Sequence, residues 1–232
     1  MLSVSNLSSN YGNIQAVKQV SVEVATGSMV ALIGANGSGK STTLKTIAGM
    51  HSPAGGTVTF KGEDVTGWST YRLVRAGLAF LPERPTSIVA PLTVEENLNL
   101  SRSAGRGNPD ESMARVYELF PRLEERSRQH AGTLSGGEQQ MMAIGRVLMT
   151  DPELLLIDSP TIGLAPAVVD EVWDAVKQLH DEGLTMLFIE QNAELALVVS
   201  DYLYLLHRGE IALEGSSHEL RGSSELVDAY LA

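Results

Sequence analysis

Residues 29–48 read MVALIGANGSGKSTTLKTIA, and no other stretch of this chain limits the possible fold classes as strongly. Met29–Ile33 is a short continuous apolar run, which is typical of a strand buried on both faces of a parallel sheet. A glycine-rich turn follows, and Thr42–Ala48 then forms a short helix that ends before Gly49. The order strand, loop, helix is the setting that a phosphate-binding loop requires.

The glycine-rich turn, Gly34–Ser41, fits the pattern G-x-x-x-x-G-K-[ST]. Its glycines let backbone N–H groups approach phosphate oxygens, and the start of the next helix adds partial positive charge. Lys40 is then placed for the β- and γ-phosphates and the Ser41 hydroxyl for Mg²⁺. A chance glycine-rich turn is the alternative, which the correct flanks and the motifs downstream oppose. The predicted nucleotide-binding residues are Gly34, Asn36, Gly37, Ser38, Gly39, Lys40, Ser41 and Thr42.

A second motif lies at Leu154–Pro160, which reads LLLIDSP. Four apolar residues ending in Asp158 are typical of a buried parallel strand that delivers a magnesium-binding carboxylate. Alone this pattern is weak, since many core strands end in Asp at a turn. Paired with the phosphate loop, it predicts that Ser41 and Asp158 are the metal ligands of the site.

The third motif is Leu134–Gln140, LSGGEQQ. Ser135 and Glu138 have the spacing of a capping box that opens a helix. Two consecutive glycines at this start leave backbone N–H groups bare, which suits an anion-binding end. A well-capped core helix without a ligand is the alternative. The apolar face of this helix comprises Met141, Ile144, Val147 and Leu148.

The rest of the chain predicts an α/β core with a helical insertion. Alternating apolar residues near Val22 and Val58 indicate half-buried strands in the first sixty residues. Strand and helix patterns alternate again after residue 150, which implies crossovers and a parallel sheet. Between them, residues of about 85–150 form a mostly helical lobe, with Asp110 as the expected N-cap of one helix. The expected apolar face of that helix comprises Met113, Val116, Tyr117, Phe120 and Leu123.

Composition limits the partners of the chain. The 232 residues include no cysteine and carry a formal charge of −11, which argues against a nucleic-acid footprint. No window approaches the roughly 20 apolar residues needed to span a bilayer. A role at a membrane would therefore require docking onto another chain.

Leu134–Gln140 followed by Leu154–Asp158 resembles the signature motif and Walker B strand of ATP-binding cassette (ABC) proteins, and residues 34–42 resemble their Walker A loop. Within this family the chain is most similar to an ATPase subunit of branched-chain amino acid importers, the LivF-like group. Relatives that serve urea or short amides are also similar. The segments that carry this subgroup resemblance are Gly34–Gly37, Leu92–Leu98, Gly163–Pro166 and Glu190–Asn192.

The resemblance implies one nucleotide-binding domain over residues 1–232. Its fold is a P-loop NTPase core with a parallel sheet, an antiparallel β subdomain and the inserted helical lobe. It also implies ATP and Mg²⁺ as cofactors, and a head-to-tail dimer with a second cassette, either the same chain or a sister chain. The subunit would dock on integral membrane permease subunits at the cytoplasmic face of the cell membrane.

The resemblance assigns further roles to individual residues. Tyr11 matches the aromatic residue that stacks on adenine, and a surface strand tyrosine is the alternative. The motif of Ser135, Gly136, Gly137 and Glu138 would bind the γ-phosphate held by the partner's loop. Glu83 stands at the coupling-loop position that faces the permease. Gln191 stands where most cassettes have the histidine that senses the γ-phosphate.

Ser159 departs from the family pattern, because the residue after the Walker B aspartate is normally the glutamate that handles the attacking water. A serine is a poor proton acceptor near neutral pH, so we predict tight nucleotide binding with slow or no turnover by an ABC-type ATPase. The chain is then the degenerate half of a heterodimer, or Ser159 is a substitution that traps the ATP-bound state. Otherwise a nearby carboxylate such as Glu190 or Glu83 replaces the base.

Two other functions compete with the importer subunit. A regulatory nucleotide-binding subunit without turnover is compatible with Ser159. A soluble cassette protein without a permease is opposed by the single cassette, the lack of sustained heptads and the acidic charge.

Overall fold

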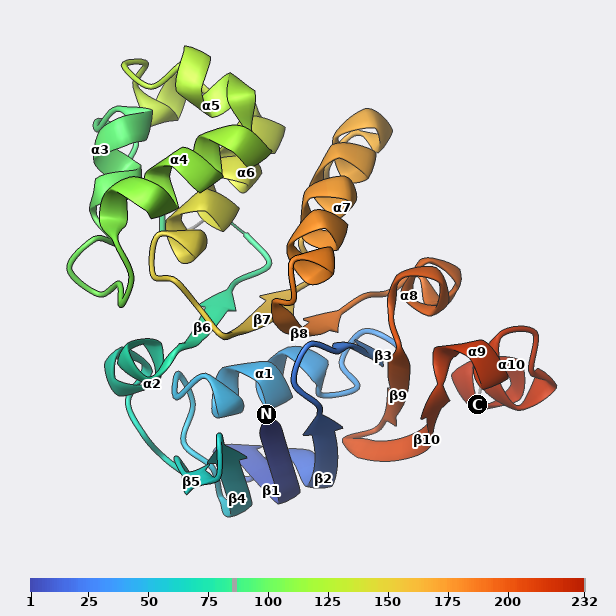
Figure 1. The fold of residues 1–232 in the computed structure, drawn as a ribbon. Coiled ribbons are helices and arrows are strands. Elements are labelled where there is room, and N and C mark those ends of the chain that lie inside the picture. The colour runs from blue at the N-terminus through green and yellow to red at the C-terminus, as the bar shows by residue number, and fades with distance from the viewer. Residues whose placement is uncertain (85–86, 232) are drawn as a thin grey trace.

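The computed structural model describes residues 1–84 and 87–231 and contains two sheets with helices around them (Figure 1). The strands are β1 (Leu2–Tyr11), β2 (Ile14–Val24), β3 (Met29–Ile33), β4 (Gly55–Phe60), β5 (Glu63–Asp64), β6 (Leu78–Leu81), β7 (Leu154–Asp158), β8 (Thr185–Ile189), β9 (Tyr202–His207) and β10 (Glu210–Ser216). The helices are α1 (Lys40–Ile47), α2 (Thr70–Ala76), α3 (Val94–Asn99), α4 (Pro109–Leu119), α5 (Pro121–Glu125), α6 (Gly136–Leu148), α7 (Pro166–Asp181), α8 (Ala193–Val199), α9 (Ser217–Leu220) and α10 (Ser224–Leu231), with a 3₁₀ turn at Ala131–Thr133.

The larger sheet has the strand order β10-β9-β3-β8-β7-β6. Its strands pair in parallel from β9 to β6, and β10 alone pairs antiparallel. Every residue of β3, β7 and β8 is buried, as the continuous apolar runs predict. Neighbouring residues of β3 enter different cores: Ala31 and Ile33 pack with the helices of one face, and Val30 and Leu32 pack towards the second sheet.

The second sheet is antiparallel, with the order β2-β1-β4-β5. It lies below α1 in Figure 1, so α1 is enclosed between the two sheets. Leu44 and Ile47 of α1 are buried in the same cluster as the inward residues of β1 and β2. The predicted fold class, a parallel core with an antiparallel β subdomain and inserted helices, is confirmed.

Helices α3 to α6 follow β6 in the chain and precede β7, its neighbour in the sheet, and they gather at the top of Figure 1. Two details of the expected helix after residue 108 were wrong. Its N-cap is Asn108, whose side chain accepts from the N–H of Asp110, because Pro109 takes the first helical position. Pro121 then starts a new helix, so Phe120 lies between two helices and Leu123 belongs to α5, although both are buried.

Across the described ranges 1–84 and 87–231, no helix combines the length and the apolar character that a membrane span requires.

Candidate functional site

The phosphate loop connects β3 to α1, and glycine is required at two of its positions. Gly34 has φ 144°, and a Cβ there would lie 2.1 Å from the carbonyl oxygen of Leu206. Gly39 has φ 107°, and its Cβ would lie 2.6 Å from the carbonyl oxygen of Ala16. A side chain at Gly34 would therefore push the loop away from β9, and one at Gly39 would push it away from β2. These clashes explain both glycines of the motif in steric terms.

The loop presents backbone donors at the start of α1. Gly39 is the N-cap of this helix, no side chain caps it, and its first turn carries no acidic residue. The first N–H groups of the helix therefore remain available to an anion, and the helix dipole favours negative charge at the same point. The Nζ atom of Lys40 donates to the carbonyl oxygens of Gly34 and Ala35 at 2.7 and 2.9 Å, which holds the cation against the loop.

Ser41 in the first turn of α1 contacts Asp158 at the end of β7, although the two residues are 117 positions apart in sequence. The Ser41 hydroxyl donates to Oδ1 of Asp158 at 3.0 Å. Two oxygens at neighbouring corners of a magnesium octahedron lie about 2.9 Å apart, because Mg–O distances are about 2.0–2.1 Å. The oxygen pair therefore fits Mg²⁺. Among the described residues no three His, Cys, Asp or Glu side chains form a metal cluster, so phosphate oxygens and water would complete the coordination.

Burial perturbs both charged residues of this region in the direction that favours neutrality. Desolvation raises the pKa of Asp158 above its ordinary value, the Ser41 hydrogen bond opposes the shift, and the charge of Glu83 adds to it. Desolvation lowers the pKa of Lys40, and the charge of Asp158 opposes that shift. Bound phosphates would add negative charge beside Lys40 and Mg²⁺ would add positive charge beside Asp158, and each favours the charged form of its neighbour.

The loop forms one wall of a pocket of about 390 Å³. The opposite wall comes from the ends of β6, β7 and β8, where Glu83, Ser159 and Gln191 line the same pocket. These three residues lie together because β6, β7 and β8 are neighbours in the sheet and their carboxyl ends meet at one edge. Of the predicted loop residues, those lining the pocket are Asn36, Gly37, Gly39, Lys40, Ser41 and Thr42.

Gly34 and Ser38 contribute to the turn rather than to the pocket wall. Ser38 is buried, and its Oγ has no hydrogen-bond partner in the described part of the chain. A buried hydroxyl without a partner is costly. In the phosphate loop such a donor suits a phosphate oxygen.

Ser159 sits in a backbone conformation that disfavours side chains. Its φ is 45°, in the left-handed region that residues with a Cβ rarely adopt. Its N–H donates to the carbonyl oxygen of Ile189 at 3.2 Å, which joins the ends of β7 and β8. Ser159 lines the phosphate pocket directly after Asp158.

The two carboxylates considered as replacements are placed differently. Glu83 lines the pocket together with Ser159 and Lys40. Glu190 is buried and does not line it, and its Oε1 accepts from the N–H groups of Gln191 and Asn192 at 2.7 and 3.0 Å. Oε1 of Glu190 is thus occupied with the backbone of the turn after β8, whereas its Oε2 is buried without a hydrogen-bond partner among the described residues.

Tyr11 ends β1 outside the lining of this pocket. Its ring is half exposed and stacks on the ring of His51, with centroids 4.5 Å apart and an angle of 28° between the planes. The His51 Nε2 atom lies 3.0 Å from the carbonyl oxygen of Asn10, which fixes the histidine beside the strand.

The signature motif lies at the start of α6, away from the pocket lining. The predicted capping box is present: the Ser135 N–H donates to Glu138 Oε2 at 2.9 Å, and the Glu138 N–H donates to Ser135 Oγ at 3.3 Å. Glu138 is buried and forms an ion pair with Arg126 at 3.1 Å. Space around Gly136 is open, whereas Gly137 packs closely against Val168 of α7.

Sequence reasoning missed three apolar residues of the pocket, Ala16, Ile162 and Ile189. Ala16 lies in β2, close to the loop through Gly39, and nothing in the local pattern distinguishes it from other strand residues. Ile189 is the last residue of β8, so the rule that ligands bind at the carboxyl ends of parallel strands would have pointed to it.

A glycine-rich loop between a buried strand and a helix, with a serine and an aspartate paired for a metal, defines a nucleotide-binding P-loop protein. Residues 17–162 match the family model described as ABC transporter. The high-affinity branched-chain amino acid transport ATP-binding protein BraG of Pseudomonas aeruginosa is 44% identical over 232 residues, which are 100% of this chain and 99% of that protein. The probable branched-chain amino acid transport ATP-binding protein LivF of Archaeoglobus fulgidus is 35% identical, covering 95% and 94% of the two chains.

One similar solved structure is a dimeric ATP-binding cassette in a post-hydrolysis state, bound to ADP and phosphate. Its TM-score is 0.81 at 26% identity, and the match covers 94% of this chain and 99% of that one. The chain therefore belongs to the ABC transporter ATP-binding family.

Proposed function

We propose that this chain is the ATP-binding subunit of an ABC importer for branched-chain amino acids. The two relatives named for that transport support this assignment, since both match almost the whole chain. The subunit acts at the cytoplasmic face of the cell membrane, where it docks on integral membrane permease subunits. In this proposal residues 1–232 form one nucleotide-binding domain, with the lobe of about 85–150 inserted in the core.

The chain works as a dimer with a second cassette. Ser135 and Gly136 are exposed at a helix start that lies outside the phosphate pocket of their own chain, with the buried Gly137 directly behind them. Such a helix start favours an anion, and a head-to-tail partner would bring its γ-phosphate there. The dimeric cassette with ADP and phosphate supports this arrangement.

Within one chain the pocket binds Mg-ATP. The loop N–H groups and Lys40 hold the phosphates, Ser41 and Asp158 hold Mg²⁺, and Tyr11 stacks on adenine. Mg²⁺ neutralises phosphate charge when it is bound. Gln191 lines the pocket with an amide that can donate to a γ-phosphate oxygen.

The mechanistic part of the proposal rests on Ser159, which lines the pocket directly after Asp158. With a serine there the chain should bind nucleotide tightly and hydrolyse it slowly. The Ser159 hydroxyl is a poor proton acceptor near neutral pH. A positioned general base is worth about 10²–10⁴-fold in rate. All the groups proposed to bind the nucleotide are present. ATP would therefore remain bound and the dimer would stay closed while a sister cassette hydrolyses its own ATP.

The test is single-turnover hydrolysis of Mg-ATP by the native chain, Ser159→Glu and Ser159→Gln, with nucleotide affinity measured in all three. The glutamine variant has nearly the same size as the glutamate variant but no basic carboxylate. We expect Ser159→Glu to be at least about a hundredfold faster than both others at equal affinity. Equal rates for all three would contradict the account of Ser159.

Glu83 is the alternative base, because it lines the same pocket. If Glu83 already accepts the proton, Glu83→Gln lowers the turnover of the native chain by about 10²-fold or more, and Ser159→Glu gives little gain. If Ser159 marks a missing base, the slow native rate is insensitive to Glu83→Gln. The two variants thus separate the two explanations.

A regulatory subunit without any turnover is the second candidate, and Ser159 favours it as well. Co-expression with the permease and the sister cassette distinguishes the candidates: transport of leucine that depends on Lys40 supports the importer. Transport of urea or short amides instead of leucine would assign a different solute to the importer. Failure to co-purify with any membrane protein would favour a soluble cassette protein.

A further inference from the structure

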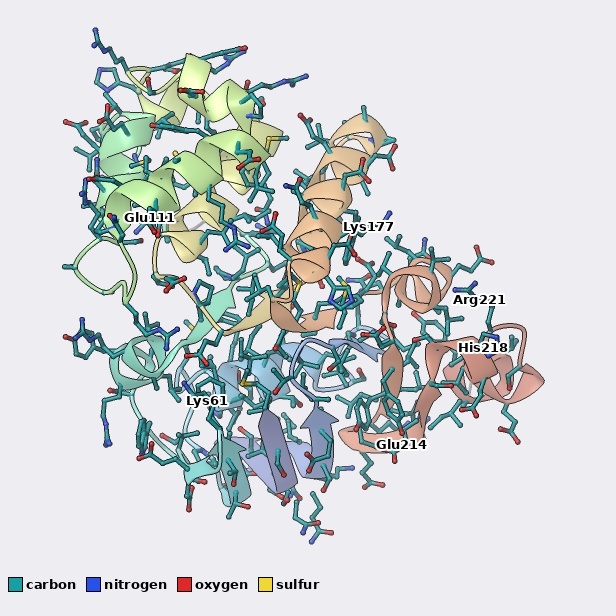
Figure 2. The ribbon with its side chains drawn as sticks, in the orientation of Figure 1. Lys61, Glu111, Lys177, Glu214, His218 and Arg221 are labelled. Carbon is teal, nitrogen blue, oxygen red and sulfur yellow. The ribbon has the colours of Figure 1, made fainter. Side chains whose placement is uncertain are left out.

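The C-terminal segment is hydrogen-bonded to the connection between β8 and β9. Arg221 donates through Nη2 to the carbonyl oxygen of Leu197 in α8 at 2.9 Å. Ser217 donates through its N–H to the carbonyl oxygen of Asp201 at 2.9 Å, and its hydroxyl lies 2.7 Å from that of Ser200. Figure 2 shows Arg221 on the side of the segment that faces α8. The segment is thus attached at the middle and at the end of this connection.

The last helix, α10, reaches the beginning of the same connection. The Tyr230 hydroxyl donates to the backbone carbonyl oxygen of Gln191 at 2.9 Å. The Tyr230 ring packs against the larger hydrophobic core, together with Ala229 and beside the buried Leu226. A ring held by packing presents its hydroxyl in one place, so this contact joins α10 to the turn after β8 at a fixed point.

Gln191 is therefore held on both sides of its Cα. Its N–H is bound by Oε1 of Glu190 at 2.7 Å, and its carbonyl by Tyr230. The same carboxylate oxygen binds the N–H of Asn192, whose side chain caps α8 by accepting from the Leu195 N–H at 3.1 Å. With both peptide groups fixed, the Cα–Cβ bond of Gln191 has one direction, and the side chain lines the phosphate pocket.

We propose that Tyr230 is a positioning residue for Gln191 and that α10 thereby belongs to the nucleotide-sensing apparatus of this cassette. The inference rests on the proposed role of Gln191 as the γ-phosphate contact. A pre-oriented amide binds the phosphate without the entropy cost of ordering a free turn. Loss of the Tyr230 hydroxyl leaves the ring in place but releases the Gln191 carbonyl, so recognition of the third phosphate weakens.

The test compares dissociation constants of the full chain for Mg-AMP-PNP, a non-hydrolysable ATP analogue, and for Mg-ADP. Only the analogue carries a third phosphate, so the ratio of the two constants isolates the γ-phosphate contact. Tyr230→Phe should weaken AMP-PNP binding by about two- to tenfold, the typical effect of one hydrogen bond, and leave ADP binding unchanged. Tyr71→Phe, at an exposed tyrosine of α2, is the matched control and should change neither constant.

Three further variants make the test decisive. Gln191→Ala should lower the preference for AMP-PNP, and Tyr230→Phe in that background should have no additional effect, because Tyr230 acts through Gln191. Arg221→Ala removes a contact of the same segment with α8 but not the one with Gln191, so the nucleotide ratio should not change.

The proposal is overturned if Gln191→Ala changes the nucleotide ratio and Tyr230→Phe does not, or if Tyr230→Phe weakens both nucleotides equally. If Gln191→Ala itself leaves the ratio unchanged, the γ-phosphate role assigned to Gln191 is wrong, and the positioning role is overturned together with it. The Gln191→Ala result thus distinguishes failure of the proposed site from failure of the inference.

Discussion

The N–H of Ser159 donates to the carbonyl oxygen of Ile189 at 3.2 Å, one residue beyond the point where Asp158 pairs with Ile189 in the parallel sheet. This bond extends the pairing of β7 with β8 by one residue beyond the end of β7, to the last residue of β8. Ser159 and Gln191 therefore reach the same pocket from neighbouring strands.

Lys40 should determine whether the phosphate loop binds nucleotide at all. Lys40→Met keeps a similar length but removes the cation, so we expect AMP-PNP affinity to fall by about 10- to 150-fold, the range for a hydrogen bond to a charged group. Isothermal titration calorimetry would measure this. Lys177→Met is the control, because Lys177 projects from α7 far from the loop and has only an exposed pair with Asp174 at 3.8 Å (Figure 2). A similar loss in both variants would contradict the assignment.

Asp158→Asn should stabilise the protein without nucleotide and weaken its dependence on Mg²⁺. The folded-state pKa of Asp158 is raised by burial, so the folded chain holds this proton more tightly than the unfolded chain. The ionised carboxylate thus costs stability at neutral pH, and asparagine removes that cost while its amide oxygen can still accept from Ser41. We expect a gain on the order of 1 kcal/mol, or about 2–4 °C in Tm.

The stability difference between Asp158→Asn and the native chain should depend on pH. As the pH falls through the raised pKa of Asp158, the native carboxyl takes up its proton and the advantage of Asp158→Asn should disappear. Thermal melts of both chains along a pH series would show this convergence. A variant that melts below the native chain at neutral pH would mean that the Ser41 hydrogen bond outweighs the burial cost.

Gly136 and Gly137 should respond in opposite ways to alanine. A Cβ on Gly137 would lie 2.5 Å from Cγ1 of Val168, whereas a Cβ on Gly136 meets no atom within 4 Å. Gly137→Ala should lose about 1–3 kcal/mol by overpacking α6 against α7. Gly136→Ala should be neutral or slightly stabilising, since alanine favours helix. Denaturant unfolding measures both, and Val168→Ala should restore stability to Gly137→Ala.

Tyr11 should contribute to binding of the adenine ring and not to binding of the phosphates. Tyr11→Phe keeps the ring and should bind ATP as the native chain does. Tyr11→Ala should weaken ATP by about 5- to 150-fold, the usual range for base–aromatic stacking. The affinity for inorganic tripolyphosphate, which has no base, should be the same in all three chains. An unchanged ATP affinity in Tyr11→Ala would identify Tyr11 as a surface residue that stacks only on His51.

The amino-acid sequence by itself determined the phosphate loop, the strands beside it and the capping box of α6. Gly34, Gly39, Lys40 and Ser41 lie within eight consecutive residues, so their geometry follows from local turn and helix rules. Errors arose where two local signals competed. At Asn108 the proline at position 109 outweighed Asp110 as the start of a helix, because its ring fixes the first helical φ.

Only the tertiary structure decided which distant residues complete the site. Ser41 meets Asp158, and Gln191 meets Tyr230, across 117 and 39 residues of chain. The two motifs predicted that Ser41 and Asp158 act together, but the hydrogen bond between them depends on strand order, in which β8 lies between β3 and β7. The contact of Tyr230 with Gln191 depends on the packing of α10 against the larger core, and no motif predicted it. Strand order and helix docking arise from burial of apolar surface shared by the whole chain, which is why local patterns do not give these contacts.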